Sequence, residues 1–578
     1  MKKFIRLIIN RRTLPYISIT LVCILLVNIL VYSYIKTENA IYYWDISAYW
    51  KNSIGLINIF NASFRDGVHS VLASLNQDYN LLPLVPLLPF LEILGTSRTI
   101  FILSILNLYL VPFAVILAYT SISLFKISGV KKKVTFYTSC LFTALFFPAL
   151  LAPILDGRPD AISLLSMALI FLLYTKTNFT KYRHYVILGI LICSMIVFRR
   201  YYSFWALGFF VSYAATIVLQ RWIINNKKLD ANLLEILKRP VYGLFISGLT
   251  IIAIMLVGFR DVFLRYITED YSDLYSAYHF GSFSNQIVLF VHNFGIIFIV
   301  PLVIALIIVF RMNKDRTLKW LSVFIVLQSV IIFLTFTRTQ TFGIHHYYML
   351  TPIFIWSFYI IFGFTIKYKK NYIVQVGMVL LIIGALSVIS FTGERSYTKD
   401  SVQQSFFGLT KSISPIKRHD IPELKSMAVY LKSIMKSSDY VYVIASSDTF
   451  NDDILRNVNL PDPIDINVSG AAHVDKRDGF PNYMFDAQYL IVADPPQIHL
   501  KPGSQDVIQY PAELILNNKA LNLISLRKFV IDNGVSLTVY KKTGPYNIEF
   551  IESLRNHFKN KYPTYPTLNF IHVLESEY

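Results

Sequence analysis

Charged residues are scarce in this chain of 578 residues: they make up 15% of it, while hydrophobic residues make up 54%. Mean hydropathy is correspondingly high, at +0.50. A disordered chain needs high charge and low hydrophobicity, and a soluble domain needs a polar surface, so this composition excludes both classes. It predicts a protein with many membrane-spanning helices.

Cysteine is nearly absent, since only Cys23, Cys140 and Cys193 occur and all three lie within apolar runs. Their positions show no disulfide framework and no metal-ligand spacing. Acidic residues are outnumbered by basic ones, which gives a net charge of +19. The basic residues lie mainly in short loops between apolar runs, where the positive-inside rule places them. We therefore expect the lipid bilayer as a partner and no nucleic acid.

The amino-terminal end lacks a small-residue cleavage site. Basic residues precede the first apolar run, at Lys2, Lys3, Arg6, Arg11 and Arg12. This pattern favours a cytoplasmic N-terminus followed by an uncleaved membrane anchor over a cleaved signal peptide.

Apolar runs predict about eleven membrane-spanning helices. In chain order they are Thr13–Tyr34, Thr99–Leu124, Val134–Leu155, Asp160–Thr175, Tyr185–Val197, Ser203–Ile223, Val241–Gly258, Ile287–Phe310, Leu318–Thr337, Tyr347–Phe364 and Tyr372–Phe391. With this count, the basic loops at 126–133, 176–183, 221–228, 311–319 and 367–370 all fall on the cytoplasmic side, as the positive-inside rule requires. An odd number of helices places everything after Phe391 outside the cytoplasm.

The apolar run Leu81–Leu94 is short for a span and contains Pro83, Pro86 and Pro89. A proline-interrupted piece of helix is tolerated at membrane depth where protein or a water-filled cavity surrounds it. Counting it as a full span would put Lys131–Lys133 outside the cytoplasm, against the charge rule. We therefore predict a re-entrant or interfacial segment.

Beyond Phe391 the composition becomes that of a soluble domain, so we divide the chain into a membrane domain (1–391) and an extracytoplasmic domain (392–578). Helical periodicity marks Ile421–Lys436, and β-rich runs mark Tyr440–Ala445, Tyr489–Ala493 and Val535–Lys541. These elements predict a small α/β domain. It has no glycine-rich phosphate loop, paired-cysteine zinc pattern or serine-centred elbow, so we do not expect the chemistry there.

Asp45 lies in the aromatic stretch Tyr42–Trp50, directly after the first apolar run. Aromatic side chains favour the membrane–water interface. A carboxylate that is partly desolvated there is a better base once it is ionised. The alternative is an aromatic belt with an incidental aspartate.

Four further polar clusters fall on the same predicted face of the membrane, where charges are costly and tend to mark function. They contain Asp78; then Asp156, Arg158 and Asp160; then Arg199 and Arg200; and finally Arg338, His345 and His346. A longer loop, Arg260–Asn285, adds Arg265, Glu269, Asp270 and Asp273.

Structural explanations exist for several of these residues. Asp156 or Asp160 is also suited to cap the next helix. Arg199 and Arg200 are also suited to reach the headgroups from a span end, although two adjacent arginines on the external side run against the positive-inside trend. Adjacent histidines point in different directions, so His345 and His346 favour hydrogen bonding or phosphate contact over a metal-ligand pair.

The series of clusters resembles one known class of enzymes. It comprises an aspartate after the first span, Asp78-Tyr79-Asn80 with Pro83 behind it, an aspartate-bearing turn before a middle span, a basic residue at the external end of a later span, and Tyr347-Tyr348 shortly before Pro352. Together they are similar to the polytopic GT-C glycosyltransferases that use polyprenyl-phosphate sugars, such as protein O-mannosyltransferases and lipid A aminoarabinose transferases. The resemblance covers roughly residues 1–391, and the external tail is similar to tails of bacterial members. One departure is that the acidic pair common in the first loop of that class is Asp45-Ile46 here.

The resemblance implies a GT-C-like fold and an inverting transfer of a sugar from a polyprenyl-phosphate donor to an envelope glycan, lipid or protein. Asp45 is then the base, with Asp78 as a second acidic candidate. The candidates to bind the donor phosphate are Arg158, Arg199, Arg200, Arg338, His345 and His346, and the other acidic candidates are Asp156, Asp160, Glu269 and Asp270. The prenyl chain is expected in a groove between helices near Leu81–Leu94.

No cofactor is assigned. The external loops contain no Asp-x-Asp, which favours a metal-free site, whereas Glu269, Asp270 and Asp273 are suited to gather a divalent cation. Metal dependence therefore stays open.

Two other functions fit the sequence. A flippase or transporter of lipid-linked sugars would also use a broken helix and buried arginines, but it should show symmetry between two halves. A non-catalytic envelope protein that binds polysaccharide would depend on the tail and not on Asp45. Richness in Ile, Lys, Asn and Tyr favours an AT-rich bacterial genome, and hence the bacterial plasma membrane with an outward-facing site.

Overall fold

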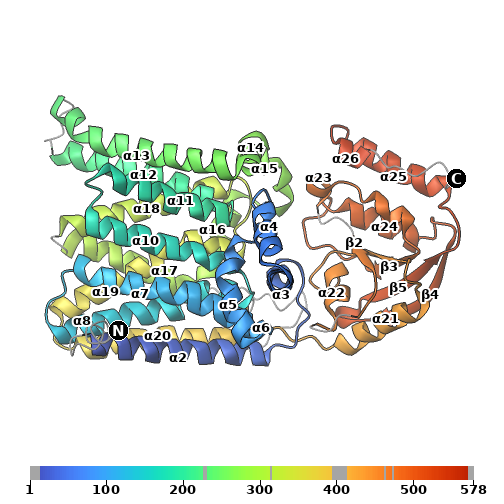
Figure 1. The fold of residues 1–578 in the computed structure, drawn as a ribbon, viewed down its shortest axis with the longest axis horizontal. Helices are drawn as coiled ribbons and strands as arrows, with labels where there is room; N and C mark the ends of the chain where they lie inside the picture. The colour runs from blue at the N-terminus through green and yellow to red at the C-terminus, as the bar shows by residue number, and fades with distance from the viewer. Residues whose placement is uncertain are drawn as a thin grey trace.

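The computed structural model describes residues 13–77, 79–224, 231–312, 315–392, 413–460, 464–470 and 474–569. A long helical bundle occupies one side of the molecule and a smaller α/β part the other, and the short helices α3 (Trp44–Ala62) and α4 (Phe64–Ser74) lie between them (Figure 1). We call residues 413–569 the C-terminal region.

Eight described helices are long and apolar enough to cross a membrane, or up to ten if two bent helix pairs each count as one span. The elements of the bundle are α2 (Leu14–Thr37), α6 (Arg98–Ile105), η2 (Leu106–Leu110), α7 (Val111–Leu124), α8 (Val130–Phe146), α9 (Pro148–Leu155), η3 (Pro159–Ala161), α10 (Ile162–Thr177), α11 (Tyr182–Phe198), α12 (Tyr202–Ile224), α13 (Ala231–Gly258), α16 (Phe283–Phe294), α17 (Ile296–Ile307), η5 (Ile308–Met312), α18 (Arg316–Phe336), η6 (Ile344–Met349), α19 (Thr351–Tyr368) and α20 (Tyr372–Thr392). Every predicted apolar run is helical, which agrees with a polytopic membrane protein. The count of about eleven spans stays a prediction.

The two bends have local causes. Helices α8 and α9 meet at 42° because Pro148 supplies no backbone N–H and pushes Phe147 into an extended conformation, with ψ of 118°. Helices α16 and α17 meet at 96°, and Gly295 between them has a φ of +77°, which glycine adopts without a steric penalty.

Prolines also shape the segment between α4 and α6. It forms a 3-10 turn, η1 (Leu82–Leu87), followed by the short helix α5 (Leu88–Leu94). Leu84, Leu87 and Leu91 are buried against the bundle, and the Tyr109 hydroxyl donates to the Pro83 carbonyl at 2.6 Å. The segment is therefore fixed to the bundle although it is short for a span.

The C-terminal region is built on a five-stranded sheet in the order β2-β1-β3-β5-β4. The strands are β1 (Val441–Ile444), β2 (Val468–Gly470), β3 (Tyr489–Asp494), β4 (Leu523–Val530) and β5 (Ser536–Lys542). Strand β1 is parallel to β2 and β3, whereas β5 is antiparallel to β3 and β4. Its helical elements are α21 (Ile421–Ile434), α22 (Asp452–Asn457), α23 (Asp475–Asp478), η9 (Asn482–Asp486), α24 (Asp506–Leu516), η10 (Asp532–Gly534), α25 (Ile548–Lys561) and α26 (Pro566–Asn569).

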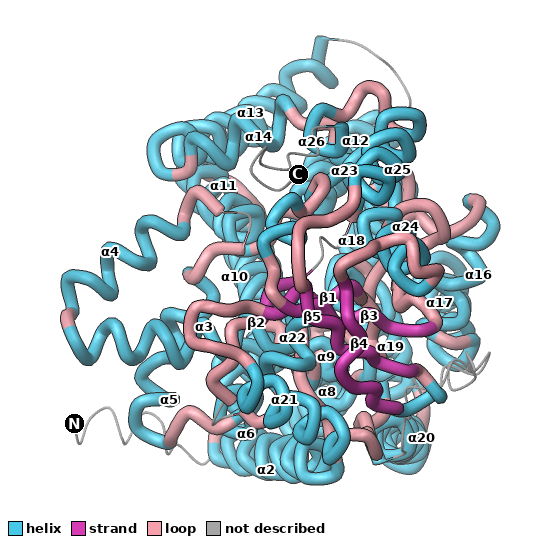
Figure 2. Tube along the Cα trace, turned by 90° about the vertical axis from the view of Figure 1, so that its right-hand side faces the viewer, coloured by secondary structure: helices cyan, strands magenta, loops and turns pink. Residues whose placement is uncertain are grey.

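Side chains of the central strands alternate between two apolar layers, as the two-residue period of a strand requires. Tyr442 and Leu490 pack with α24 and α25 on one face. Val443 and Ile491 pack with α21 and α22 on the other. The predicted helix and three predicted strands are present in this region. Figure 2, which views the molecule from the side of the sheet, shows the strands in front of the bundle, with α3 and α4 to one side.

The long loop after α13 forms α14 (Arg260–Thr268), α15 (Tyr271–Leu274) and η4 (Ser276–Tyr278). It contacts the C-terminal region, because Lys476 lies 2.5 Å from Asp273 and Arg477 donates to the Tyr278 hydroxyl at 3.2 Å. At the opposite end of the bundle, Lys126 and Asp315 pair at 2.8 Å, which joins two of the predicted basic loops.

Candidate functional site

A cavity of about 1050 Å³ lies where the bundle meets the C-terminal region, and we call it the site cavity. From the bundle it is lined by Asp45, Asp156, Arg158, Arg199, Arg200, His345 and His346, among others. The C-terminal region contributes Asp448, Asp453, Arg477 and His499. All five sequence-predicted clusters therefore contribute side chains to one cavity, the Asp78 cluster through its neighbour Tyr79.

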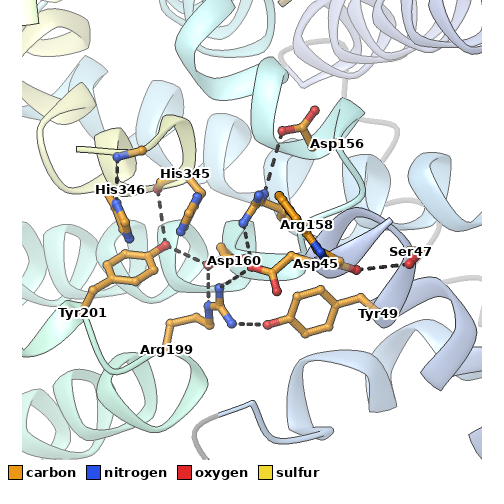
Figure 3. A network of polar contacts seen from close by, with 12 residues as sticks. Asp45, Ser47, Tyr49, Asp156, Arg158, Asp160, Arg199, Tyr201, His345 and His346 are labelled. Atoms are coloured by element: carbon orange, nitrogen blue, oxygen red, sulfur yellow. Dashed lines mark hydrogen bonds and ion pairs between the residues drawn. The ribbon is translucent and has the colours of Figure 1, made fainter. Parts of the chain in front are cut away.

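Asp45 is the second residue of α3 and lies against two arginines (Figure 3). Its Oδ2 accepts from Nη1 of Arg158 at 2.9 Å and lies 3.8 Å from Nη2 of Arg199. The side chain keeps 30% of its surface exposed. Both ion pairs are closest at Oδ2.

Arg199, between α11 and α12, is held by a buried carboxylate. Its Nε lies 2.7 Å from Oδ1 of Asp160, and the exposed fractions of the two side chains are 6% and 0%. The Tyr201 hydroxyl donates to the same oxygen at 2.9 Å, and Nη1 of Arg199 donates to the Tyr49 hydroxyl. Asp160 thus fixes the guanidinium in place, and the helix that follows has no side-chain cap.

Asp156 and Arg158 share the tight turn after α9. The Arg158 Nε lies 3.8 Å from the Asp156 carboxylate. Between them, Gly157 has a φ of +80°, and a Cβ there would lie 2.8 Å from Nη1 of Arg98. The turn therefore requires glycine, both for its conformation and for the close approach of Arg98.

Arg98 is a residue of this site that sequence reasoning missed. It is 6% exposed, and it donates to the backbone carbonyl of Ile46 at 2.6 Å and to that of Asp156 at 3.0 Å. Arg98 therefore joins the first turn of α3 to the turn that carries Arg158. Its only signal in the sequence was a charge at the start of an apolar run.

The two histidines lie in η6, beside Tyr201 (Figure 3). The ring of His346 lies 4.8 Å and that of His345 5.6 Å from the Tyr201 ring. Burial lowers the pKa of both histidines well below the ordinary value, and the neighbouring arginines lower it further. Both rings are therefore neutral at neutral pH and serve as hydrogen-bonding groups rather than cations.

The remaining arginines differ in placement. Arg200 lines the site cavity and stacks over Tyr271 at 3.9 Å and Tyr275 at 4.7 Å. Arg338, at the end of α18, is exposed and is not among the described residues that line the cavity.

Asp78 lies outside the described residues. Its neighbour Tyr79 lines the cavity, with its ring 4.6 Å from the Arg199 guanidinium. Asn80 is buried and donates to the Val197 carbonyl at 2.6 Å. Tyr79, from the sequence motif Asp78-Tyr79-Asn80, therefore lies at the site beside Arg199.

Glu269 and Asp270 are exposed, and neither is among the described residues that line the site cavity. Asp270 caps α15 by accepting from the backbone N–H of Ser272 at 3.0 Å. Asp273 bonds Lys476 and the Tyr565 hydroxyl in the C-terminal region. Within the described ranges, no group of three or more His, Cys, Asp or Glu side chains is arranged to hold a metal ion.

A second cavity, of about 860 Å³, lies inside the bundle between α7, α10, α12, α18 and α19. Aromatic rings dominate its lining, including Tyr174, Phe209 and Trp356, with Arg221 and Arg239 at its basic end. Met349 in its lining and Tyr347 in the lining of the site cavity both belong to η6. Its lining does not include the segment Leu82–Leu94.

Comparison of the sequence with known protein families and with curated proteins gives no match. The functional argument therefore rests on the geometry of the site.

Proposed function

We propose that the protein is a membrane glycosyltransferase that moves a sugar from a polyprenyl-phosphate donor to a hydroxyl of a cell-envelope acceptor. The observation that carries the proposal is the arrangement at Asp45. One partly exposed carboxylate lies 2.9 Å from Arg158 and 3.8 Å from Arg199, in a cavity large enough for a glycan and its acceptor.

The reaction requires one base. The acceptor oxygen attacks the anomeric carbon in line with the leaving group, and the bond between that carbon and the phosphate oxygen breaks. The bonding electrons leave with the polyprenyl phosphate, and the acceptor proton passes to the Asp45 carboxylate. A glycosidase needs a second carboxylic acid because it expels a poor leaving group, whereas a phosphate leaves without protonation.

The leaving phosphate gains negative charge, and the arginines are suited to stabilise it. A guanidinium binds phosphate through two parallel N–H groups. Arg199 is held in position by its hydrogen bond to Asp160 and Arg158 by its hydrogen bond to Asp45, so little reorganisation is needed when the charge develops. The neutral rings of His345 and His346 add hydrogen-bond donors without competing for a proton.

The prenyl chain needs an apolar path from the phosphate into the bilayer. We assign it to the aromatic cavity inside the bundle, because η6 contributes residues to the lining of both cavities. The basic loops joined by Lys126 and Asp315 lie at the other end of the bundle, so the positive-inside rule orients the site cavity toward the outer face of the membrane.

The test is sugar transfer by the purified full-length protein in lipid, with a panel of polyprenyl-phosphate sugars. Asp45→Asn keeps the size of the side chain and removes the base, so we expect transfer to fall by about 10²- to 10⁴-fold. Asp66→Asn is the matched control, because Asp66 is exposed on α4. Equal turnover by wild type and Asp45→Asn would show that another residue is the base. No turnover with any donor, together with movement of lipid-linked sugar across a vesicle membrane, would favour the flippase.

A further inference from the structure

The segment that leads into Asp45 is bound by the C-terminal region before it enters α3. The backbone of Asn39 forms a bridge to this region: its N–H donates to the Ile416 carbonyl at 2.9 Å, and its carbonyl accepts from the Arg418 N–H at 2.8 Å. The Asn39 side chain donates to the Arg418 carbonyl at 2.8 Å as well. The connection between α2 and α3 therefore pairs with the C-terminal region like a short strand.

Apolar side chains of the same segment lie in the core of the C-terminal region. Ile41 is 3% exposed and Tyr43 is 4% exposed, and both belong to the apolar layer that contains Leu424 and Ile454. Burial of two large side chains ties the segment to this region more strongly than surface contacts do.

Trp44, directly before Asp45, adopts a conformation that needs support from its surroundings. Its φ is +47°, which a bulky residue rarely adopts unless neighbouring groups fix it. The C-terminal region supplies two such groups. Asp453 accepts from the Trp44 backbone N–H at 2.8 Å, and the His499 ring lies 4.5 Å from the Trp44 indole.

Asn457, one helical turn after Asp453 in α22, also contacts the start of α3. Its Nδ2 donates to the Tyr42 carbonyl at 2.8 Å and to the hydroxyl of buried Ser47 at 3.2 Å. Lys51, one turn further along α3, contacts the same two residues of α22. Its Nζ lies 3.4 Å from Oδ1 of Asp453 and donates to the side-chain oxygen of Asn457 at 3.2 Å. The backbone before Asp45 and the side chains of Ser47 and Lys51 after it are thus bonded to α22.

From these contacts we infer that Asp453 and Asn457 are positioning residues for Asp45, so that the C-terminal region is an integral part of the site. The chemical part of this inference rests on the proposed transferase function. These two side chains fix the first turn of α3 so that the Asp45 carboxylate stays beside Arg158 and Arg199. A displacement of about 1 Å in a reacting group lowers an enzymatic rate by up to about 10²-fold.

The kinetic test compares Asn457→Asp and Asp453→Asn with wild type in the full-length protein. Asn457→Asp keeps the shape of the side chain and removes both donated hydrogen bonds. Asp452→Asn is the matched control, because the Asp452 carboxylate bonds Arg456 within α22. We expect kcat to fall by about 10- to 100-fold with an unchanged KM for the donor, and the control to behave as wild type. Unchanged kcat, or a raised KM at constant kcat, would overturn the inference.

A second readout does not depend on any activity. The thiol introduced by Asp45→Cys is labelled with a membrane-impermeant maleimide, since the native cysteines are at most 4% exposed. We expect the labelling rate to rise severalfold when Asn457→Asp or Asp453→Asn is added, and to stay constant with Asp452→Asn. Equal labelling rates in all backgrounds would contradict the inference. If wild type transfers no sugar, the proposed function fails, and the labelling rates alone decide whether α22 positions residue 45.

Discussion

The Nε of Arg199 lies 2.7 Å from Oδ1 of Asp160, and the exposed fractions of these side chains are 6% and 0%. Two opposite charges so far from water stabilise the fold only while both are present, because either one alone would be a buried, uncompensated charge. Arg199 also donates to the Tyr49 hydroxyl, and the Tyr201 hydroxyl donates to Oδ1 of Asp160. Structural integrity and the proposed donor binding therefore depend on the same arginine.

The first prediction concerns this pair. Asp160→Ala leaves the Arg199 guanidinium buried without its carboxylate, and we expect a loss of about 3–5 kcal/mol in the free energy of unfolding. Arg338→Gln, at an exposed position, should change it by less than about 0.5 kcal/mol. Denaturant titration of both variants in detergent measures the difference, and a loss below about 1 kcal/mol for Asp160→Ala would show that the pair is not essential.

The second prediction separates two reasons for a glycine. Gly157 and Gly129 both have a φ of +80°, but only Gly157 has the Arg98 guanidinium within reach of an added Cβ. Gly129→Ala should cost about 1 kcal/mol from backbone strain alone. Gly157→Ala also displaces Arg98 from the Ile46 and Asp156 carbonyls, which should cost about 1.5–3 kcal/mol more. Thermal unfolding of the two variants gives the comparison, and equal losses would contradict the role of Arg98.

The third prediction is a dependence of stability on pH. The folded protein keeps His345 and His346 neutral, since burial lowers the pKa of each well below the ordinary value. The unfolded chain binds protons at both positions as the pH falls below about 6.5. Protonation therefore favours unfolding, and stability that is complete above this pH is lost as the pH falls further.

The double variant His345→Gln, His346→Gln should lose less stability than wild type between pH 7 and pH 5, as its melting temperature reports. His69→Gln, in exposed α4, is the control for the removal of a histidine from the surface. Parallel pH profiles for wild type and the double variant would show that these rings do not resist protonation.

The fourth prediction concerns the leaving phosphate. Arg158→Lys keeps the positive charge beside Asp45 but cannot bind the phosphate through two parallel N–H groups, so kcat for transfer should fall by about 10²-fold. Arg338→Lys should leave transfer unchanged, because this exposed side chain is not among the described residues that line the site cavity. Steady-state kinetics with one donor measures both variants, and equal rates would exclude Arg158 from donor binding.

Apolar runs were sufficient to predict the long helices of the bundle, because each run is long and a helix is the stable form of such a sequence in a bilayer. They did not predict α3, which carries Asp45. Short β-rich runs likewise predicted β1, β3 and β5. Strand β4 was missed although most of its residues are apolar, because Ser525, Arg527 and Lys528 interrupt the apolar run. Strand β2 has only three residues.

The sequence placed Asp45, Arg158 and Arg199 on one face, and they line one cavity in the structure. The sequence did not predict that Asp160 pairs with Arg199, since a turn aspartate is equally suited to cap a helix. Asp453 and Asn457 were missed for another reason. Their contacts with the first turn of α3 span more than four hundred positions, and no local pattern encodes such a contact.

The bridge between Asn39 and Arg418 joins residues 379 positions apart, which has a consequence for biosynthesis. A ribosome makes Asn39 early, and most helices of the bundle follow before the residues that pair with it exist. Domains fold as their chain emerges, so the first turn of α3 acquires its support only when translation is nearly complete. A nascent chain, or one truncated within the bundle, therefore sits in the membrane without a finished site.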